Sequence, residues 1–218
     1  MTLALFDLDN TLLSGDSDYE WGNFLVKKKL VDEVRYERAN QKFYEDYKAG
    51  ILDIYEFSAF TFEVLTRFSM SELDILHQEF MHEVILPLIT EKARALVAKH
   101  QAQQHTLAII TATNEFITTP IAKELGIPHL IATQPKIVNG RYTTKVQGTP
   151  CFKEGKVTRL AEWMQHHNEK LAGSYFYSDS HNDLPLMQQV TTAIAVDPDD
   201  KLRQIAKQKG WEIISLRN

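Results

Sequence analysis

The chain has 218 residues, of which 44% are hydrophobic and 24% charged, so it can bury a substantial core as one domain or as one domain with an insert. Its net charge of -5 and the absence of any block of like charge exclude a basic surface for nucleic acid or anionic lipid. The lone Cys151 excludes an internal disulfide, and no stretch approaches the roughly 18 apolar residues of a membrane helix. The N-terminus also lacks a basic region and a cleavage site. We therefore expect a cytoplasmic protein without nucleic-acid or membrane partners, and the oligomeric state stays open.

The first predicted element is a buried strand at residues 3–6, which runs directly into Asp7 and Asp9. The next strand pattern begins only at residue 106. The interval between them has helical periodicity and no convincing strand, and it is far longer than a βα crossover needs. We predict a helical cap at residues 14–87, inserted into a core domain formed by residues 1–13 and 88–218.

Beyond the insert, apolar strand patterns alternate with amphipathic helical patterns. Strands are expected at residues 106–110, 129–133, 174–178, 192–196 and 211–215, and helices at 115–125, 154–166, 183–189 and 199–209. Residues 136–146 are an exception, because Asn139-Gly140 between two β-rich arms is typical of a type I′ hairpin. The alternation predicts an α/β fold, a Rossmann-like parallel sheet with helices on both faces, plus the inserted helical cap.

Polar side chains follow these strands where they end, and in a parallel sheet such ends share the edge at which ligands bind. They are Asp7, Asp9 and Thr11; Thr111, Thr113 and Asn114; Asp179, Ser180, Asn182 and Asp183; and, beside a helix start, Lys153 and Lys156. Four carboxylates this close repel one another unless a cation is present. With no histidine or cysteine among them, the oxygen ligands favour Mg²⁺ over zinc, and the hydroxyls and lysine suit a phosphate dianion. The sequence therefore predicts a phosphoryl-transfer site.

These segments resemble, in order, the four motifs of the haloacid dehalogenase superfamily. They are DLDNT at residues 7–11, an apolar strand ending in Thr111, a downstream lysine, and SDSHND at residues 178–183. An aspartate pair alone occurs in many proteins, but four motifs at matching strand ends are specific, and the resemblance covers nearly the whole chain. It implies the core fold of that superfamily and a Mg²⁺-dependent phosphatase.

By that resemblance Asp7 is the nucleophile that forms an aspartyl-phosphate, while Asp9 protonates the leaving alkoxide and then deprotonates the attacking water. Asp7, Asp179 and the backbone carbonyl of Asp9 would hold Mg²⁺. The presence of Asp9 favours phosphatase over dehalogenase activity, because an ester leaving group needs a proton and a halide does not.

The resemblance places the phosphate against Thr111 and the backbone amides of Ala112 and Thr113. It also assigns Asn182 and Asp183 to this site, with Asp183 supporting the metal ligands.

The catalytic lysine is open between two residues. Relatives close to phosphoserine phosphatase carry it directly before a glycine, where this chain has Glu154. We favour Lys156, which matches the EGK pattern of a neighbouring branch, and Lys153 is the alternative.

The position of the insert resembles the small cap of the phosphoserine-phosphatase-like branch, which reads the leaving group. That branch uses an acid soon after the first motif for the substrate's amine. Asp16 stands at the corresponding place, with Asp18 and Glu20 nearby. The alternative for such acids is a capped, amphipathic first helix.

The cap arginine that binds a carboxylate in that branch is not kept. Counted from Phe57 its position falls on Val64, and only a shifted register reaches Arg67. An acid without this arginine suits an amino-alcohol phosphate, such as L-histidinol phosphate. The opening stretch and CFKEGKV also resemble the histidinol-phosphate phosphatases of this branch, and Tyr19 and Trp21 are candidates to stack on the imidazole.

The sequence thus predicts a phosphomonoesterase that hydrolyses L-histidinol phosphate in histidine biosynthesis. The alternatives are a phosphoserine phosphatase or a broad small-metabolite phosphatase, and, from another class, a phosphate-binding regulator without turnover. Asp9 argues against the regulator, because binding alone needs no general acid.

Overall fold

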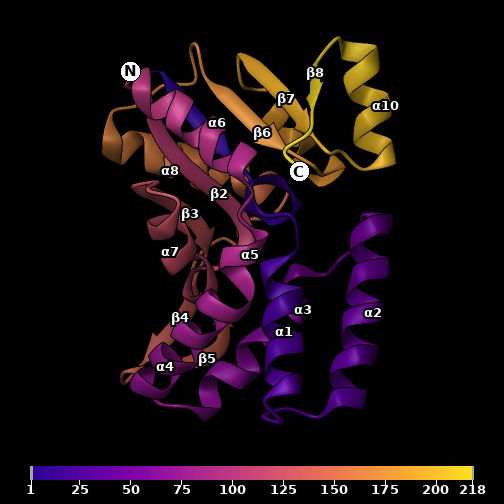
Figure 1. Cartoon of the computed structure of the whole chain (residues 1–218), viewed down its shortest axis with the longest axis vertical. Helices are drawn as coiled ribbons and strands as arrows, with labels where there is room; N and C mark the ends of the chain where they lie inside the picture. The colour runs from indigo at the N-terminus through magenta and orange to yellow at the C-terminus, as the bar shows by residue number, and fades with distance from the viewer. Residues whose placement is uncertain (1, 218) are drawn as a thin grey trace.

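A computed structural model describes residues 2–217 and contains one sheet of six parallel strands (Figure 1). The strand order is β3-β2-β1-β6-β7-β8, and every neighbouring pair is parallel. The strands are β1 (Leu3–Phe6), β2 (Thr106–Asn114), β3 (His129–Thr133), β6 (Tyr175–Ser178), β7 (Thr192–Val196) and β8 (Glu212–Ile214). The predicted α/β fold with a Rossmann-like parallel sheet is confirmed.

Strand β1 is apolar along its whole length because both of its faces are covered. Leu3 and Leu5 pack into one hydrophobic cluster, and Ala4 and Phe6 into another on the opposite face. The first cluster includes residues of α8 (Glu154–His167) and α10 (Asp200–Lys209), and the second includes residues of α6 (Glu91–Ala102) and α7 (Glu115–Glu124). The helices therefore cover both faces, as the alternating pattern predicted.

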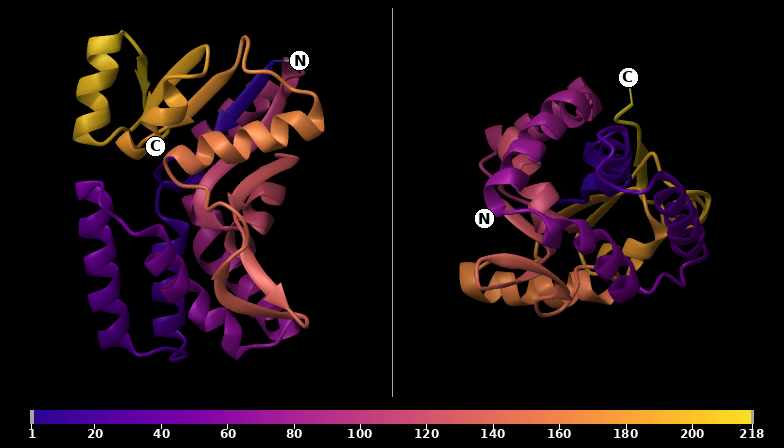
Figure 2. Two further views of the ribbon diagram at one scale, coloured as in Figure 1. Left: turned by 180° about the vertical axis from the view of Figure 1, so that it is seen from behind. Right: turned by 90° about the horizontal axis from the view of Figure 1, so that it is seen from below.

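The segment between β1 and β2 is helical. It contains α1 (Ser17–Lys27), α2 (Glu33–Ala49), α3 (Ile54–Glu63), a 3-10 turn (Val64–Arg67), α4 (Met70–Phe80), a π-helical turn (Met81–Ile85) and α5 (Leu86–Leu88). The first four helices lie together beyond the sheet (Figures 1 and 2). Their first turns are each capped by a side-chain oxygen, from Asp16, Asp32, Asp53 and Ser69. This arrangement supports the proposal that residues 14–87 form a cap over a core of residues 1–13 and 88–218.

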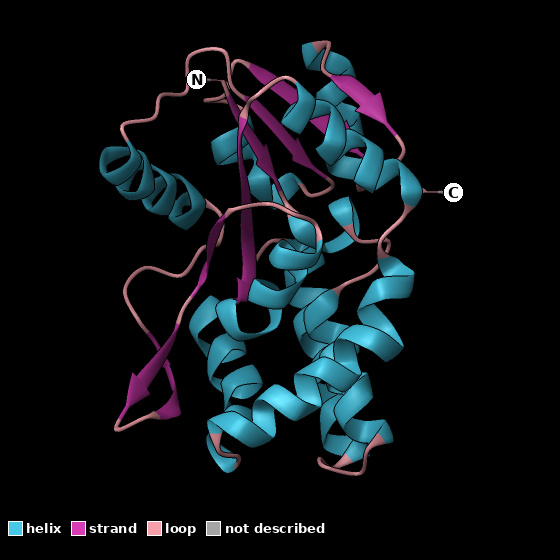
Figure 3. Ribbon diagram, turned by 60° about the vertical axis from the view of Figure 1, so that its left-hand side comes forward, coloured by secondary structure: helices cyan, strands magenta, loops and turns pink. Residues whose placement is uncertain are grey.

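The hairpin consists of β4 (Pro135–Val138) and β5 (Arg141–Val146). Asn139 and Gly140 both have positive φ angles, 50° and 73°, so the predicted type I′ turn is confirmed. The hairpin forms its own two-stranded sheet (Figure 3). Strand β5 packs against α3 of the helical segment. The hairpin, which follows β3 in the sequence, thus packs against the helical segment.

Two element boundaries differ from the prediction. Strand β2 continues to Asn114, beyond the predicted end at residue 110, because Asn114 still pairs with Thr133 of β3 after an irregularity in register. The predicted helix at residues 183–189 is a 3-10 turn (His181–Asp183) followed by the short α9 (Leu184–Met187). Among residues 2–217, no helix combines the length and the apolar character needed to cross a membrane.

We expect Gly155→Ala to destabilise the protein. A Cβ atom at Gly155 would lie 2.0 Å from the backbone oxygen of Pro150, so the first turn of α8 or the loop before it must move. Overpacking of this kind costs about 1–3 kcal/mol of unfolding free energy. Urea denaturation measures the loss, and an unchanged midpoint would contradict the close contact.

Gly22→Ala is the matched control. Its added Cβ would meet only side-chain atoms of Asn40 and Tyr36, at ordinary contact distances of 3.4 Å or more. Because alanine is the better helix former by about 1 kcal/mol, this variant is expected to be at least as stable as the parent.

Candidate active site

A tight turn directly after β1 places the first two aspartates. The backbone N–H of Asp7 donates to the Tyr177 carbonyl (2.9 Å), so Asp7 is still fixed against β6. The next five residues, Leu8–Leu12, form an irregular turn in which Asp9 is extended and Asn10 is left-handed, with φ 54°. Asparagine tolerates this conformation better than most residues. The turn carries both carboxylates at the carboxyl edge of the sheet.

The side chain of Asp7 is paired with Lys156 in the interior. The Lys156 Nζ donates to Asp7 Oδ1 and to Asp183 Oδ2, both at 2.8 Å, and all three side chains are buried. Burial lowers the pKa of Lys156, but the carboxylates of Asp183 and Asp7 outweigh this effect and raise it. The ammonium group therefore stays charged and is shared by two carboxylates.

The end of β6 supplies the second pair of acids. Asp183 also accepts a hydrogen bond from the Ser178 hydroxyl at 2.7 Å. Asp179 contacts Thr11 twice: its Oδ1 accepts from the hydroxyl at 3.2 Å, and its backbone N–H donates to that hydroxyl oxygen at 3.1 Å. The first and fourth sequence motifs are thus joined directly.

Negative charge exceeds positive charge in this cluster. Burial raises the pKa of Asp7 to about 7 despite the ammonium of Lys156, and Asp183 adds to the rise. Burial also raises the pKa of Asp179 well above its usual value, reinforced by the charges of Asp7 and Asp183. A further cation would relieve this repulsion.

The donor set suits a hard cation that keeps water ligands. No group of three His, Cys, Asp or Glu side chains within residues 2–217 is arranged to hold a metal by itself. The predicted set needs only two carboxylates, Asp7 and Asp179, with the backbone carbonyl of Asp9. Mg²⁺ commonly binds through one or two carboxylates and retains several waters, so these residues fit it.

Asp9 is held by two other segments. Its Oδ1 accepts from the backbone N–H of Ser17 at 2.6 Å, and its Oδ2 accepts from the Thr113 hydroxyl at 2.7 Å. Burial raises the pKa of Asp9 to about 6, and the charge of Asp16 acts in the same direction. A carboxyl group with a pKa near neutrality can both give and take a proton at physiological pH.

The end of β2 is turned toward these acids. Thr111 is 1% exposed, and its hydroxyl oxygen accepts from the backbone N–H of Thr113 at 3.2 Å. Ala112, between them, is partly exposed. The hydroxyl of Thr113 is engaged by Asp9, so Thr113 contacts the carboxylate that was assigned the proton transfers.

The two candidate lysines have different surroundings. Lys156 lies in the first turn of α8 and contacts the Asp7 carboxylate. Lys153 precedes that helix with a positive φ of 50°, and its Nζ donates to the backbone oxygen of Gly50 at 2.6 Å. Of the two, only Lys156 touches the acid cluster.

Asp16 and Asp18 also have different hydrogen-bond partners. Asp16 is the N-cap of α1, accepting from the backbone N–H groups of Asp18 and Tyr19, both at 3.0 Å. This is the capped helix that the sequence left as an alternative. The Asp18 carboxylate accepts from Asn114 Nδ2 at 3.3 Å, and burial, with the charges of Asp16 and Asp9, raises its pKa well above the usual value.

Two of the remaining predicted residues have side-chain contacts outside the acid cluster. Asn182 is buried, and its Nδ2 donates to the backbone oxygen of Tyr47 at the end of α2 (3.2 Å). Trp21, a candidate to stack on a substrate ring, is 3% exposed and packs instead against Phe24 and Phe80 among other rings. Trp21 is therefore a core residue of the helical segment.

Sequence reasoning missed two contacts to the site. Ser17 was not singled out, yet its backbone N–H fixes Asp9; the signal was its place at the start of a capped helix. Tyr47 was not singled out either. Its hydroxyl donates to Ser180 Oγ at 2.7 Å, and burial raises its pKa well above normal, as do the charges of Asp179 and Asp183. No local pattern identifies such a contact.

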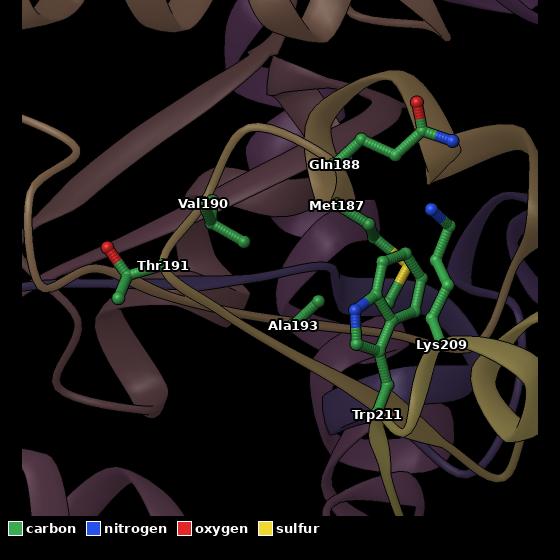
Figure 4. A pocket seen from close by; sticks show the side chains of 7 residues that line it. All are labelled: Met187, Gln188, Val190, Thr191, Ala193, Lys209 and Trp211. Carbon is green, nitrogen blue, oxygen red and sulfur yellow. The ribbon is translucent and has the colours of Figure 1, made fainter.

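A separate hollow of about 460 Å³ lies near the amino ends of β7 and β8, away from the strand ends that carry the acids (Figure 4). It is lined by residues at the amino ends of β7 and β8, including Ala193 and Trp211, and by Met187 and Lys209. No carboxylate lines it, so it offers none of the chemistry of the acid cluster.

The known proteins that this chain resembles include hydrolases and phosphatases. A sequence model of the haloacid dehalogenase-like hydrolases matches residues 4–188. The chain is 47% identical to a histidinol-phosphatase of Neisseria meningitidis over 99% of both chains. A solved structure of a protein of unknown function from Bordetella pertussis matches 100% of both chains with a TM-score of 0.93 and 44% identity. A substrate-bound phosphoserine phosphatase shares the fold, with a TM-score of 0.71 and 16% identity over 99% of this chain and 93% of that one.

We expect Lys156→Gln to destabilise the protein in a pH-dependent way when a chelator is present. Removing one partner of a buried ion pair costs about 3 kcal/mol or more. Without the ammonium, the folded-state pKa of Asp7 rises further above its unfolded value. A group with a raised folded-state pKa loses its stabilising contribution as pH rises, so the deficit against the parent should be larger at pH 8 than at pH 5.

Urea unfolding at the two pH values measures this deficit. Lys153→Gln is the control, because this lysine contacts the Gly50 carbonyl and the Phe152 ring rather than a carboxylate of the cluster, so any loss of stability should be equal at the two pH values. A deficit for Lys156→Gln that is equal at both pH values would refute the shared-ammonium interpretation.

Proposed function

Because this chain belongs to the haloacid dehalogenase-like hydrolases and is a phosphoric monoester hydrolase, we propose that it works through an aspartyl-phosphate on Asp7 and acts on L-histidinol phosphate. The observation that carries the mechanistic part is the buried contact of Lys156 with the Asp7 carboxylate, at the same sheet edge as Asp9 and Asp179. This contact supports the proposal because the residues proposed as nucleophile, acid and cationic group lie at the same sheet edge.

In the proposed reaction, an Asp7 carboxylate oxygen attacks phosphorus in line, and the bond from phosphorus to the leaving oxygen breaks. Asp9 gives its proton to that oxygen as the alcohol departs. In the second half, Asp9 takes a proton from water, whose oxygen attacks the aspartyl-phosphate and releases phosphate and Asp7. The pKa of Asp9, raised to about 6, suits both transfers.

Asp7, Asp179 and the carbonyl of Asp9 would hold Mg²⁺, which when bound neutralises charge on the carboxylates and the phosphate. The chain's own contributions are positional. Lys156 keeps the Asp7 carboxylate oriented and adds positive charge beside the phosphate. Asp183 in turn fixes Lys156.

The rest of the phosphate site is assigned to the end of β2. Thr111, with the backbone amides of Ala112 and Thr113, would bind the phosphate oxygens as the motif resemblance implies. Thr113 also orients Asp9 through its hydroxyl.

For the substrate, we propose Asp18 as the carboxylate that recognises the ammonium group. Within residues 2–217 it accepts a hydrogen bond from Asn114 but has no ion-pair partner, whereas Asp16 is occupied as a helix cap. A substrate ammonium would supply the missing charge. Val64 is buried and Arg67 is exposed on the following turn, which fits a substrate without a carboxylate.

The 47% identity to a histidinol-phosphatase along the whole chain supports this choice over other amine-bearing phosphates. A phosphoserine phosphatase or a broader metabolite phosphatase is the second candidate, favoured by the shared cap position. A regulator without turnover is disfavoured because Asp9 is present and held by two hydrogen bonds.

The substrate assignment predicts a higher kcat/KM for L-histidinol phosphate than for phosphoserine in the presence of Mg²⁺. Chelation should remove the activity and added Mg²⁺ restore it. Asp7→Asn should abolish turnover of both esters because the amide is a poor nucleophile. A preference for phosphoserine would overturn the substrate, and turnover by Asp7→Asn would overturn the nucleophile.

Asp18→Asn is expected to lower kcat/KM on L-histidinol phosphate by about 10-fold or more, the scale of a lost charge-assisted contact, and to leave p-nitrophenyl phosphate nearly unchanged. Asp16→Asn is the matched control. It retains a capping oxygen and changes only the charge near Asp9, so its loss on L-histidinol phosphate should be smaller than that of Asp18→Asn. Equal losses for Asp18→Asn would assign Asp18 to the fold rather than to the substrate.

A further inference from the structure

The turn that carries Asp9 accepts two hydrogen bonds from a residue about two hundred positions away in sequence. The guanidinium of Arg217 donates to the backbone carbonyl of Asn10 at 2.6 Å and to that of Leu13 at 3.1 Å. Asn10 is the left-handed residue of the turn and directly follows Asp9. One planar group thus joins the middle and the end of the turn, a two-point contact that a fork of N–H donors makes well.

Arg217 is itself fixed. Its Nε lies 3.9 Å from Asp197 Oδ2, and the same carboxylate oxygen accepts from the backbone N–H of Leu216 at 2.9 Å. Leu216 is buried, and its carbonyl accepts from the Thr90 hydroxyl at 2.7 Å. The segment after β8 is therefore anchored to both the sheet edge and the start of α6, so the guanidinium is held at a defined position.

The side-chain contacts of Asp9 come from Ser17 and Thr113, on two other segments. Those contacts orient the carboxylate only if the backbone of Asp9 is held in register with them. A left-handed residue persists where surrounding contacts fix it. In this turn the left-handed residue is Asn10, and its carbonyl accepts a hydrogen bond from Arg217.

We propose that Arg217 is a positioning residue for the reaction, acting as a clamp that sets the acid–base carboxylate of Asp9 through the backbone of its turn. The proposal rests on the proposed function, in which Asp9 protonates the leaving oxygen. Arg217 makes no contact with the reacting atoms. Its removal moves the backbone of Asp9, and with it both the acid and the carbonyl proposed to bind Mg²⁺, whereas Asp7 is fixed separately by β6 and Lys156.

The test is the dependence of Arg217→Gln on the leaving group. An alkyl phosphate expels a strongly basic alkoxide that needs the proton of Asp9, whereas p-nitrophenyl phosphate expels a weakly basic phenolate that does not. The parameter kcat/KM reports the steps up to departure of the leaving group. Displacement of a catalytic group by about 1 Å can cost about 100-fold. At saturating Mg²⁺ we expect kcat/KM to fall about 10- to 100-fold on L-histidinol phosphate and to change less than about threefold on p-nitrophenyl phosphate.

Asp9→Asn in the same assays separates this proposal from the function on which it depends. If Asp9→Asn does not discriminate between the two esters, the acid role of Asp9 is wrong and the clamp falls with it. If Asp9→Asn discriminates and Arg217→Gln loses activity equally on both esters, or on neither, only the clamp is overturned.

Arg203→Gln is the control variant, because Arg203 also donates to a backbone carbonyl, that of Pro198, but on the exposed side of α10. It should match the parent on both esters. Arg217→Lys, which keeps one cationic donor, should recover part of the alkyl-phosphate activity. Should Arg217→Gln be too unstable to assay, millimolar guanidinium added to Arg217→Ala decides the question: selective recovery on the alkyl ester supports the clamp, and no recovery refutes it.

Discussion

The ammonium group of Lys156 lies between the carboxylates of Asp7 and Asp183, and the rest of the site depends on this contact. Three buried charges are tolerable only because they are paired, since an unpaired buried charge costs several kcal/mol. The pairing joins the first, third and fourth sequence motifs in one place. Gly155 directly precedes the lysine, and there α8 passes so close to the Pro150 carbonyl that a side chain would not fit.

The surroundings of Asp9 differ from those of Asp7. Among residues 2–217 no cation pairs with it, and two neutral donors hold its carboxylate while burial raises its pKa to about 6. The two aspartates are two residues apart on one turn, yet their side-chain partners come from different segments, Lys156 for Asp7 and Ser17 and Thr113 for Asp9. This difference in surroundings suits the roles proposed for them, Asp7 as the nucleophile and Asp9 as the acid and base.

The helical segment and the sheet edge are also linked directly. The end of α2 meets the loop after β6 through the Tyr47 hydroxyl and the Asn182 amide, and Lys153 caps the Gly50 carbonyl at the end of the same helix. These contacts bring a buried phenol close to the acid cluster. They give the proposed cap a physical means of excluding water from the carboxylates, which strengthens every charge interaction among them.

The strands, the type I′ hairpin and the chemical class of the site followed from the sequence alone. Burial on both faces of a parallel strand leaves a continuous apolar run, as in Leu3–Phe6, and Asn139-Gly140 favours positive φ by itself. Such features depend on neighbouring residues, so a local pattern carries them. The tertiary structure decided which groups meet. Lys156 rather than Lys153 contacts Asp7, Asp16 caps α1 while Asp18 contacts Asn114, and Arg217 contacts the turn at Asn10. Each of these choices depends on how distant segments approach one another in space, and no spacing along the chain encodes that approach.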